Sequence, residues 1–459
     1  MESFRRALGV IVACVLVPAV PRAFAQADAT APTTVTVTLD DAIQRTLQCN
    51  PGFASARQAV PIAKGRYVQA RAGVLPKLSA TTYRMRQNVP GVNMGGYVVF
   101  GGGLYVPQMD DERVDFSVQL VNLQNLKTTA AANHEVRASR SDVERARIEL
   151  IATVKKTFYD VLLADELIRV HQAEIAVAQR QLDLSRLRYT VGSSPELDVL
   201  RAEVKLENDR PQLLAAVHAR EIAEQKLLNL MALPSNLHVA ARGRFAELVQ
   251  APPRSQIIQR ALDTRPEVTA ARERLKGAHR TLQAANAGYL PTVTGAASYD
   301  KSVGIRYPIT DGITLYSATV QMNVPIFDGL ATSGKVREAL GSWRKARSDL
   351  ASLCRSIELE IIQALSAMAQ ARAVLAATDR TVHQADRALT IAQESYRAGA
   401  RTHLEVLDAQ LNLTQARSNR AQALRDYSCA LADLERAQGL PSSNARARGS
   451  DRGDGRTTK

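Results

Sequence analysis

The two stretches that decide the fold read Thr314-Leu-Tyr-Ser-Ala-Thr-Val-Gln-Met322 and Val114-Asp-Phe-Ser-Val-Gln-Leu120. Apolar and polar side chains alternate along both, and Thr, Val and Tyr are frequent, which is typical of β-strands with two different faces. Each stretch follows another segment of strand character, Leu78 to Val89 or Val293 to Val303. A glycine-rich loop separates the first pair, and a loop around Asp311-Gly312 separates the second. The sequence therefore predicts two strand pairs, four strands in all.

Two long segments connect these strands to the rest of the chain. Proline is absent from about Lys127 to Arg188 and from about Lys335 to Arg397. About 60 helical residues at ~1.5 Å each give a rod of roughly 90 Å, which needs a partner helix. Two return helices can serve, Ser194 to Leu230 and Arg401 to Ala437. Residues spaced three and four apart predict the seam of the second return helix: Leu404, Leu407, Leu411, Leu424, Tyr427, Leu431 and Leu434. The predicted fold is mostly α with a small β part.

This order of segments is written twice. With an offset of 215 residues, Ile43, Pro51 and Gly73 recur as Ile258, Pro266 and Gly288. With an offset of 207 residues, Tyr189, Gly192 and Leu200 recur as Tyr396, Gly399 and Leu407. Each copy begins with a short helix (40–48 and 256–263) and a longer one (51–72 and 266–287). We expect an internal two-fold repeat, 37–250 and 256–441, without a domain boundary between the copies.

Residues 1–25 have the pattern of a secretory signal peptide. Arg5 and Arg6 precede the apolar run Ala7 to Val17, and Ala23-Phe-Ala25 forms a small-x-small cleavage site. An alternative is a lipoprotein site with an acylated Cys14, although apolar residues continue beyond that cysteine. Residues 442–459, rich in Arg, Gly, Ser and Asp, predict a disordered basic tail.

Composition excludes several classes of protein. The formal charge of +14 at pH 7 is shared with the leader and tail, and aromatic residues make up only 5% of the chain, which disfavours nucleic-acid binding. Cys49, Cys354 and Cys429 form no disulfide framework, and buried free thiols are expected. The histidines are dispersed, and no metal, nucleotide or nucleophile motif is present. We therefore expect no cofactor and no bound metal.

Four strands raise a problem of closure. They cannot close a barrel, and open sheet edges are a liability in water and forbidden in lipid. The chain is expected to leave the cytoplasm and to lack a transmembrane helix, so several chains would pool their strands. Two chains give eight strands and a barrel filled by side chains, whereas three give twelve strands and an open lumen.

Several motifs carry a resemblance over residues of about 37 to 441. They are Leu39-Asp-Asp-Ala42, Asn50-Pro51, Gly73-Val-Leu-Pro76, Val324-Pro-Ile-Phe-Asp-Gly329, Ala398-Gly399 and Leu404-Glu-Val-Leu-Asp-Ala-Gln410. In this order they resemble the TolC outer-membrane efflux family. The resemblance implies a homotrimer with a 12-stranded β-barrel in outer-membrane lipid and a 12-helix periplasmic α-barrel. It also implies a periplasmic adaptor (membrane fusion) protein and an inner-membrane pump of the RND or ABC class as partners, and a protein that is not an enzyme.

The two helix-to-helix turns are the candidate site. Gly192 and Gly399 lie just past a helix end, where a positive φ is easily reached, so each turn is the tip of an antiparallel hairpin. The resemblance makes these tips the periplasmic aperture and the surface on which the adaptor docks. The expected docking residues are Val191, Gly192, Leu197, Ala398, Gly399 and Leu404.

The resemblance also assigns an aperture gate. Glu405 and Asp408 match positions whose carboxylates ring the aperture, although Glu405 stands where the family often has Asp. Tyr396 and Arg401 match positions that bond to the acidic residue matched by Asp198 on a neighbouring helix pair. Exposed acids and an exposed arginine without such roles are the alternative interpretation.

Three function classes follow from these patterns. The first is the exit duct of a tripartite efflux system that exports small molecules. The second is the same duct in type I protein secretion, which an adjacent ABC exporter gene would indicate. The third is a periplasmic coiled-coil scaffold, which trimers in the outer-membrane fraction would exclude. The exported substrate is not encoded in these motifs.

Overall fold

The computed structural model describes residues 34–86, 92–94, 97–100, 103–105, 108–250, 252–304 and 313–440. The expected signal peptide, Cys14 and the expected basic tail lie outside these residues. So do the loop around Asp311-Gly312 and parts of the glycine-rich loop.

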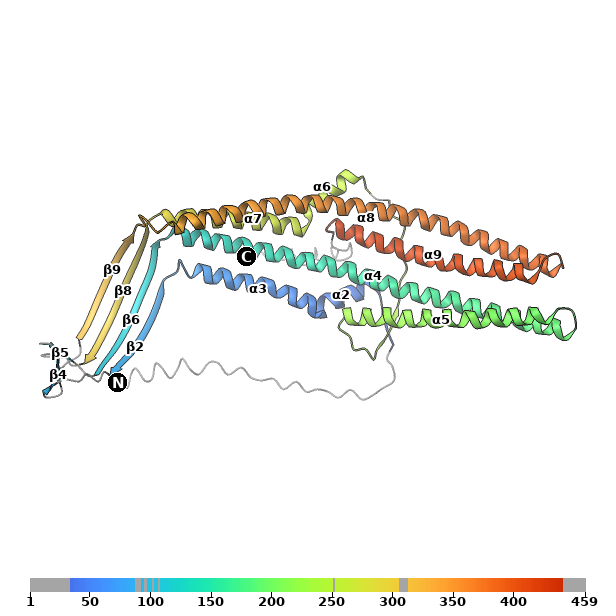
Figure 1. Ribbon diagram of the computed structural model, residues 1–459, viewed down its shortest axis with the longest axis horizontal. Helices are drawn as coiled ribbons and strands as arrows, with labels where there is room; N and C mark the ends of the chain where they lie inside the picture. Colours follow the sequence, from blue (N-terminus) through green and yellow to red (C-terminus); the bar gives the residue numbers. More distant parts are fainter. Residues whose placement is uncertain are drawn as a thin grey trace, which may run out of the picture.

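Two long helices run the length of the helical part (Figure 1). They are α4 (Leu123–Thr190) and α8 (Ala331–Arg397), of 68 and 67 residues, so each is about 100 Å long. Both predicted rods are confirmed. The return helices α5 (Glu196–Leu230) and α9 (His403–Ala437) pack on α4 and α8 respectively.

Shorter helices complete the wall next to the strands. α3 (Pro51–Arg71) packs on α4, and α7 (Pro266–Asn286) packs between α4 and α8. The neighbours near the strands are therefore α3, α4, α7 and α8, and nearer the tips they are α5, α4, α9 and α8. This arrangement is a wall one helix thick, and the part of the chain that the structure describes leaves its two broad faces uncovered.

Local sequence explains where the helices of the first copy begin. The short helix α2 (Leu39–Cys49) starts at a capping box, in which Asp41 N–H donates to Thr38 Oγ1 and Thr38 N–H donates to Asp41 Oδ2. α3 starts at Asn50, whose Oδ1 accepts from Phe53 N–H at 3.0 Å, with Pro51 as its first residue. The corresponding helices of the second copy are α6 (Arg254–Thr264) and α7, which the 3₁₀ turn η1 (Ala287–Tyr289) follows.

The predicted strand pairs join into one antiparallel sheet. Its strands are β2 (Lys77–Arg86), β6 (Gln108–Val121), β8 (Thr292–Gly304) and β9 (Ile313–Asn323), in the order β2-β6-β8-β9. The edges β2 and β9 have no further strand partner among the described residues. The predicted glycine-rich loop is more ordered than expected, because it contains three short strands, β3 (Val92–Met94), β4 (Tyr97–Phe100) and β5 (Gly103–Tyr105).

The four-stranded sheet has one apolar and one polar face. The register places Phe116 beside Leu78 and Ala297, and Val320 beside Gly295, on the apolar face. The opposite face carries ion pairs of Arg113 with Asp115 (2.8 Å) and Asp300 (3.4 Å). Ser298 and Ser317 bond to each other there at 2.8 Å, and Leu315 is an apolar exception. One face is thus suited to lipid and the other to water.

A small parallel sheet crosses the middle of the wall, and sequence reasoning missed it. β1 (Thr34–Val37) pairs with β7 (His238–Ala241), which joins the start of the first copy to its end. Val239 and Phe158, both fully buried, pack there with Leu227 in the largest apolar cluster. This cluster anchors the base of the first hairpin.

The predicted seam of α9 is only partly right. Tyr427 and Leu434 are buried as expected, but Leu404 and Leu411 are about half exposed. Val406 and Leu413 are buried in their place, because near the tip α9 turns a different side toward α8. The leucine side is left uncovered within the chain.

The expectation of buried free thiols needs correction. The three cysteines among the described residues are free; Cys429 is buried, Cys354 is half-buried and Cys49 is exposed at the end of α2. The helix α8 contains an 18-residue window apolar enough to cross a membrane by length and composition alone. That test is weak evidence here, because α8 continues without a break from the sheet to the tip and packs on α9 along the way.

Candidate functional site

The two hairpin tips are built by the same backbone turn. Ser193 N–H donates to Arg188 C=O at 2.8 Å, and Ala400 N–H donates to Ser395 C=O at 2.9 Å. These six-to-one bonds close the helix ends around glycines with φ of +71° at Gly192 and +75° at Gly399. A Cβ would meet nothing within 4 Å at either glycine, so the requirement is for the positive φ and not for space.

The tips differ in how the returning helix begins. At the second tip Thr402 caps α9 together with Glu405, whose Oε1 accepts from Thr402 N–H at 3.3 Å. Arg401 pairs with the other oxygen of Glu405 at 2.5 Å. The backbone hydrogen bond from Thr402 and then the bond from Arg401 lower the pKa of Glu405, so this carboxylate stays charged at neutral and mildly acidic pH. At the first tip Pro195 precedes α5 and makes no side-chain cap.

The expected gate residues lie at the tips, and most of them contact other residues of the same chain. Asp198, with its side chain 18% exposed, lies 4.0 Å from Arg201 of the same helix. Arg401 bonds to Glu405, and Asp408 is exposed. The expected contact of Asp198 with Arg401 and Tyr396 joins two helix pairs of an assembly, so it stays a prediction.

The expected docking residues form the surface of the tips. Val191, Leu197 and Leu404 are 70%, 51% and 48% exposed. Gly192, Ala398 and Gly399 are also exposed. The tips therefore present apolar side chains to solvent.

Arg188 is a tip residue that sequence reasoning missed. Its guanidinium lies 4.7 Å from the centre of the Tyr396 ring, so the last turn of α4 contacts the last turn of α8. Comparison of the two copies could have drawn attention to Arg188, because the corresponding residue of the second copy is Ser395. The contact joins the two hairpins of one chain at their tips.

The first hairpin contains a buried charged cluster, which we call the Lys205 cluster: Glu174 on α4 with Lys205 and Asp209 on α5. The Lys205 ammonium contacts Glu174 at 2.5 Å and also Asp209, and both carboxylates are nearly inaccessible. His171 Nδ1 lies 3.4 Å from Glu174. Asp209 Oδ2 has no hydrogen-bond partner among the described residues.

The electrostatics of the Lys205 cluster are unbalanced. Burial and the charge of Glu174 raise the pKa of Asp209, although Lys205 opposes the shift. Burial disfavours the charged Lys205, but bonds to Asp209 and Glu174 outweigh it and raise the pKa of Lys205. The cluster therefore holds two carboxylates against one ammonium.

The second hairpin lacks this cluster. The offset of 207 places Thr381, Asn412 and Ala416 opposite Glu174, Lys205 and Asp209. Its two helices instead join through apolar residues such as Met368 and Tyr427. Both hairpins have apolar contacts between their helices, and the first differs from the second by its buried charged cluster.

The two hairpins are joined firmly at the middle of the wall. Lys156 of α4 pairs with Asp433 of α9 at 2.6 Å, and Asp160 pairs with Arg425 at 2.7 Å. Nearer the tips a groove of about 310 Å³ lies between α4, α8 and α9, lined by Glu166, His383, Arg417 and others. The hairpins are thus anchored at one end and contact each other through Arg188 and Tyr396 at the other, which permits a swing of the tips.

Among the described residues no group of three or more His, Cys, Asp or Glu side chains is placed to hold a metal ion. The described site consists of turns, ion pairs and exposed apolar side chains.

Comparison with known proteins places this geometry in context. The family model "Outer membrane efflux protein" matches residues 42–233 and 257–440. The chain is 26% identical over 340 residues to outer membrane protein TolC of Vibrio cholerae, an alignment covering 71% of this chain and 76% of that protein. It is 25% identical over 407 residues to outer membrane efflux protein BepC of Brucella suis, covering 88% and 85%. The match to pyoverdine export outer membrane protein OpmQ of Pseudomonas putida is 28% identical but spans only 60% of that relative.

Solved structures share the fold. The Campylobacter jejuni CmeC outer membrane channel has a TM-score of 0.76 at 18% identity, covering 90% of this chain and 88% of that one. The open state of the Neisseria gonorrhoeae MtrE outer membrane channel has a TM-score of 0.72 at 21% identity, covering 88% and 89%.

Proposed function

Because the chain belongs to the outer membrane efflux protein family, we propose that it forms the exit duct of a tripartite system that exports small molecules. It is an outer-membrane protein with a periplasmic helical extension. The observation that best supports a duct is a sheet with an apolar face and open edges that continues into a helical wall about 100 Å long.

Closure of this wall requires further copies of the chain. Backbone groups on the edges of β2 and β9 must be paired in lipid, and three chains supply twelve strands. Twelve strands leave a water-filled lumen, which the polar face with Arg113, Asp115 and Asp300 would line. The exposed Leu404 and Leu411 are then available for contact with the next hairpin. A homotrimer accounts for all three features.

The tips act as the gate in this proposal. In a closed trimer Asp198 would bond to Arg401 and Tyr396 of a neighbouring helix pair, and Glu405 and Asp408 would ring the aperture. Within one chain Arg201 and Glu405 compete for these same partners. The lock can therefore exchange between pairs inside a chain and pairs between chains, which is a low-barrier way to open an aperture.

The proposed partners are a periplasmic adaptor and an inner-membrane pump. The exposed Val191 and Leu197 of the first tip and Leu404 of the second fit an adaptor with apolar contact residues. Type I protein secretion is the second candidate, because one relative, at 24% identity, is the alkaline protease secretion protein AprF of Pseudomonas aeruginosa.

A crosslinking experiment with a cysteine introduced at each tip tests the duct and its partners. Val191→Cys and Ala398→Cys have ordinary negative φ, so they avoid the strain of replacing Gly192 or Gly399. The background should carry Cys49→Ser, because that thiol is exposed. We expect heat-modifiable trimers in the outer-membrane fraction and crosslinks from both tips to one adaptor.

The identity of the pump that co-purifies with this adaptor separates the two candidates. A pump for small molecules supports efflux, and an ABC exporter with a protein substrate supports secretion. Monomers in the periplasmic fraction, with no adaptor crosslink, would refute the duct itself.

A further inference from the structure

Charge is distributed unevenly along the helical wall. We call the part beside the sheet the basic wall: α3, α7, residues 123–147 of α4 and residues 331–349 of α8. It carries 18 Lys and Arg against 7 Asp and Glu. The remainder of α4 and α8, together with α5 and α9, carries 20 Lys and Arg against 23 Asp and Glu. The positive charge of the helices is therefore concentrated in the basic wall, where it raises the local concentration of anions.

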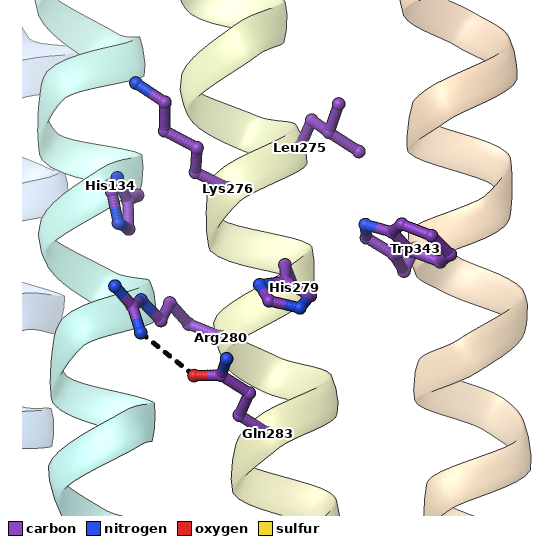
Figure 2. Close-up of a pocket in the computed structure, with 7 residues that line it drawn as sticks. All are labelled: His134, Leu275, Lys276, His279, Arg280, Gln283 and Trp343. Carbon is purple, nitrogen blue, oxygen red and sulfur yellow. Dashed lines mark hydrogen bonds between the residues drawn. The ribbon is translucent and has the colours of Figure 1, made fainter.

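A hollow of about 550 Å³ lies within the basic wall, between α4, α7 and α8. Figure 2 shows its lining, with His134 from α4, Trp343 from α8, and Lys276, His279 and Arg280 among the side chains from α7. Its size suits a small molecule.

Beside this hollow the carboxylate of Glu273 interacts with several basic side chains. Glu273, which is 8% exposed, bonds to Lys276 at 2.7 Å and His134 at 2.9 Å, and lies 3.9 Å from Arg137. Burial opposes its charge, but the bonds from Lys276 and His134 outweigh burial and lower the pKa of Glu273. The single negative charge of Glu273 cannot neutralise both Lys276 and Arg137, so this region keeps a net positive charge.

Arg280 adds a further unneutralised charge. Its Nη1 donates to the neutral Gln283 Oε1 at 2.9 Å, drawn in Figure 2, and it has no carboxylate partner among the described residues. Arg274 on the same helix is different, because it pairs with Asp142 at 2.5 Å and Glu135 at 3.6 Å. Arg280 thus has hydrogen-bond donors left for an anionic ligand, and a guanidinium matches the geometry of carboxylate and phosphate.

The opposite side of the hollow is aromatic. The rings of His279 and Trp343 lie 6.2 Å apart, and Figure 2 shows Trp343 reaching from α8 toward α7. A flat apolar group can pack on these rings while an acidic group reaches Arg280. We propose that this hollow binds a small organic anion, with its phosphate or carboxylate on Arg280 and its apolar body against Trp343. The site goes beyond the proposed duct, since neither the tips nor the sheet requires it.

The chain offers a built-in reporter for this site. Trp343 is its single tryptophan, so intrinsic tryptophan fluorescence reports on the hollow alone. The purified full chain in detergent, without added lipid and at constant ionic strength, is titrated with inorganic phosphate, phenyl phosphate and benzoate. We expect saturable changes, with phenyl phosphate saturating at lower concentration than inorganic phosphate because its ring packs on Trp343.

Two variants distinguish a site from a general field. Arg280→Gln should weaken phenyl phosphate binding by roughly tenfold or more, through loss of a charge-assisted hydrogen bond. Arg274→Gln removes the same charge from the same helix but should leave binding nearly unchanged, because Arg274 is already paired. Arg280→Lys, which keeps the charge without the fork, should fall between the wild type and Arg280→Gln.

Three outcomes overturn the proposal. The first is a linear, non-saturating response in the wild type. The second is an equal loss in Arg280→Gln and Arg274→Gln, which would indicate only the diffuse charge of the basic wall. The third is a signal that appears only after anionic phospholipid is added, which would assign the hollow to a lipid headgroup. None of these readouts depends on export, so they are independent of the duct.

Discussion

Three charged residues of the first hairpin form ion pairs in its buried interior. Glu174, Lys205 and Asp209 are removed from water between two helices, where charges are stable only when paired. The second hairpin has apolar residues such as Met368 and Tyr427 between its helices, and its ion pairs, such as Arg417 with Asp386, are exposed. The Lys205 cluster therefore makes one hairpin of the two sensitive to charge substitution and to pH.

Replacement of the ammonium tests the pairing. Lys205→Met would leave two carboxylates buried together, and we expect it to lower the free energy of opening of the α4/α5 hairpin by about 3 to 5 kcal/mol. Hydrogen exchange of α5 amides measures this change. Lys226→Met, at an exposed position of the same helix, is the matched control. Equal loss of protection in both variants would show that the cluster has no special role.

Asp209 should make the first hairpin pH-dependent. Its pKa in the folded chain is raised above the ordinary 3.8, so the folded state binds the proton more tightly than the unfolded state. The resulting stabilisation is complete below the unfolded pKa and is lost as pH rises through the folded pKa. Asp209→Asn resembles the protonated form and should remove this dependence. Hydrogen exchange, corrected for intrinsic rates, should show it in α4/α5 and not in α8/α9 of the wild type. A pH slope that persists in Asp209→Asn would contradict the assignment.

At the scale of elements, the sheet and the helices meet the same problem of unfilled surface. Among the described residues nothing covers either face of the sheet, and its edge strands β2 and β9 have a strand partner on one side only. The wall of helices is one layer thick, so half-exposed leucines such as Leu411 remain on α9. The described residues of one chain therefore supply only part of what these surfaces could pack against.

Neighbouring residues of β9 should respond in opposite ways to one added charge. Val320 lies on the apolar face and Thr319 on the polar face. Arginine on the lipid side of such a sheet costs about 2–4 kcal/mol at the membrane midplane and little on the lumen side. Val320→Arg should therefore reduce heat-modifiable trimers in the outer-membrane fraction, and Thr319→Arg should leave them near the wild-type amount. The reverse order would mean that the two faces are assigned the wrong way round.

For the whole molecule, motion follows from where the hairpins are joined. Ion pairs such as Lys156 with Asp433 and Asp160 with Arg425 hold them at the middle, and a groove separates them nearer the tips. The Arg188 contact with Tyr396 then restrains the far end. Two hairpins that are joined at the middle of the wall, and by one contact at the tips, can move apart at the tips when that contact is broken.

Loss of the proposed contact between Asp198 and Arg401 should let the tips move apart. Asp198→Ala combined with Arg401→Ser removes the expected inter-chain pair, so we expect a larger single-channel conductance in planar bilayers. Arg417→Ser removes an ion pair with Asp386 within the second hairpin and is the control. Unchanged conductance in the double variant, or an equal rise in the control, would remove the lock assignment.

Much of the local structure could be read from residue order. Proline-free segments predicted α4 and α8, alternation predicted the strands, and Gly192 and Gly399 predicted the tips, because these signals act over a few neighbouring residues. The resemblance supplied the family, which the match over 42–233 and 257–440 then showed. The candidate gate residues do lie at the tips, but their partners in the chain were not predictable from spacing alone.

The sequence by itself determined the long helices, the four strands of the large sheet and the two tips, since propensity, periodicity and turn chemistry are local properties. Only the tertiary structure decided which surfaces meet. It paired β6 with β8 and β1 with β7, buried Val406 instead of Leu404, and placed Arg188 over Tyr396. It also enclosed Glu174 with Lys205 and Asp209, and left Arg280 without a carboxylate partner among the described residues. These outcomes depend on the rotation and packing of whole helices, where small angular differences change the partner of every side chain on a face.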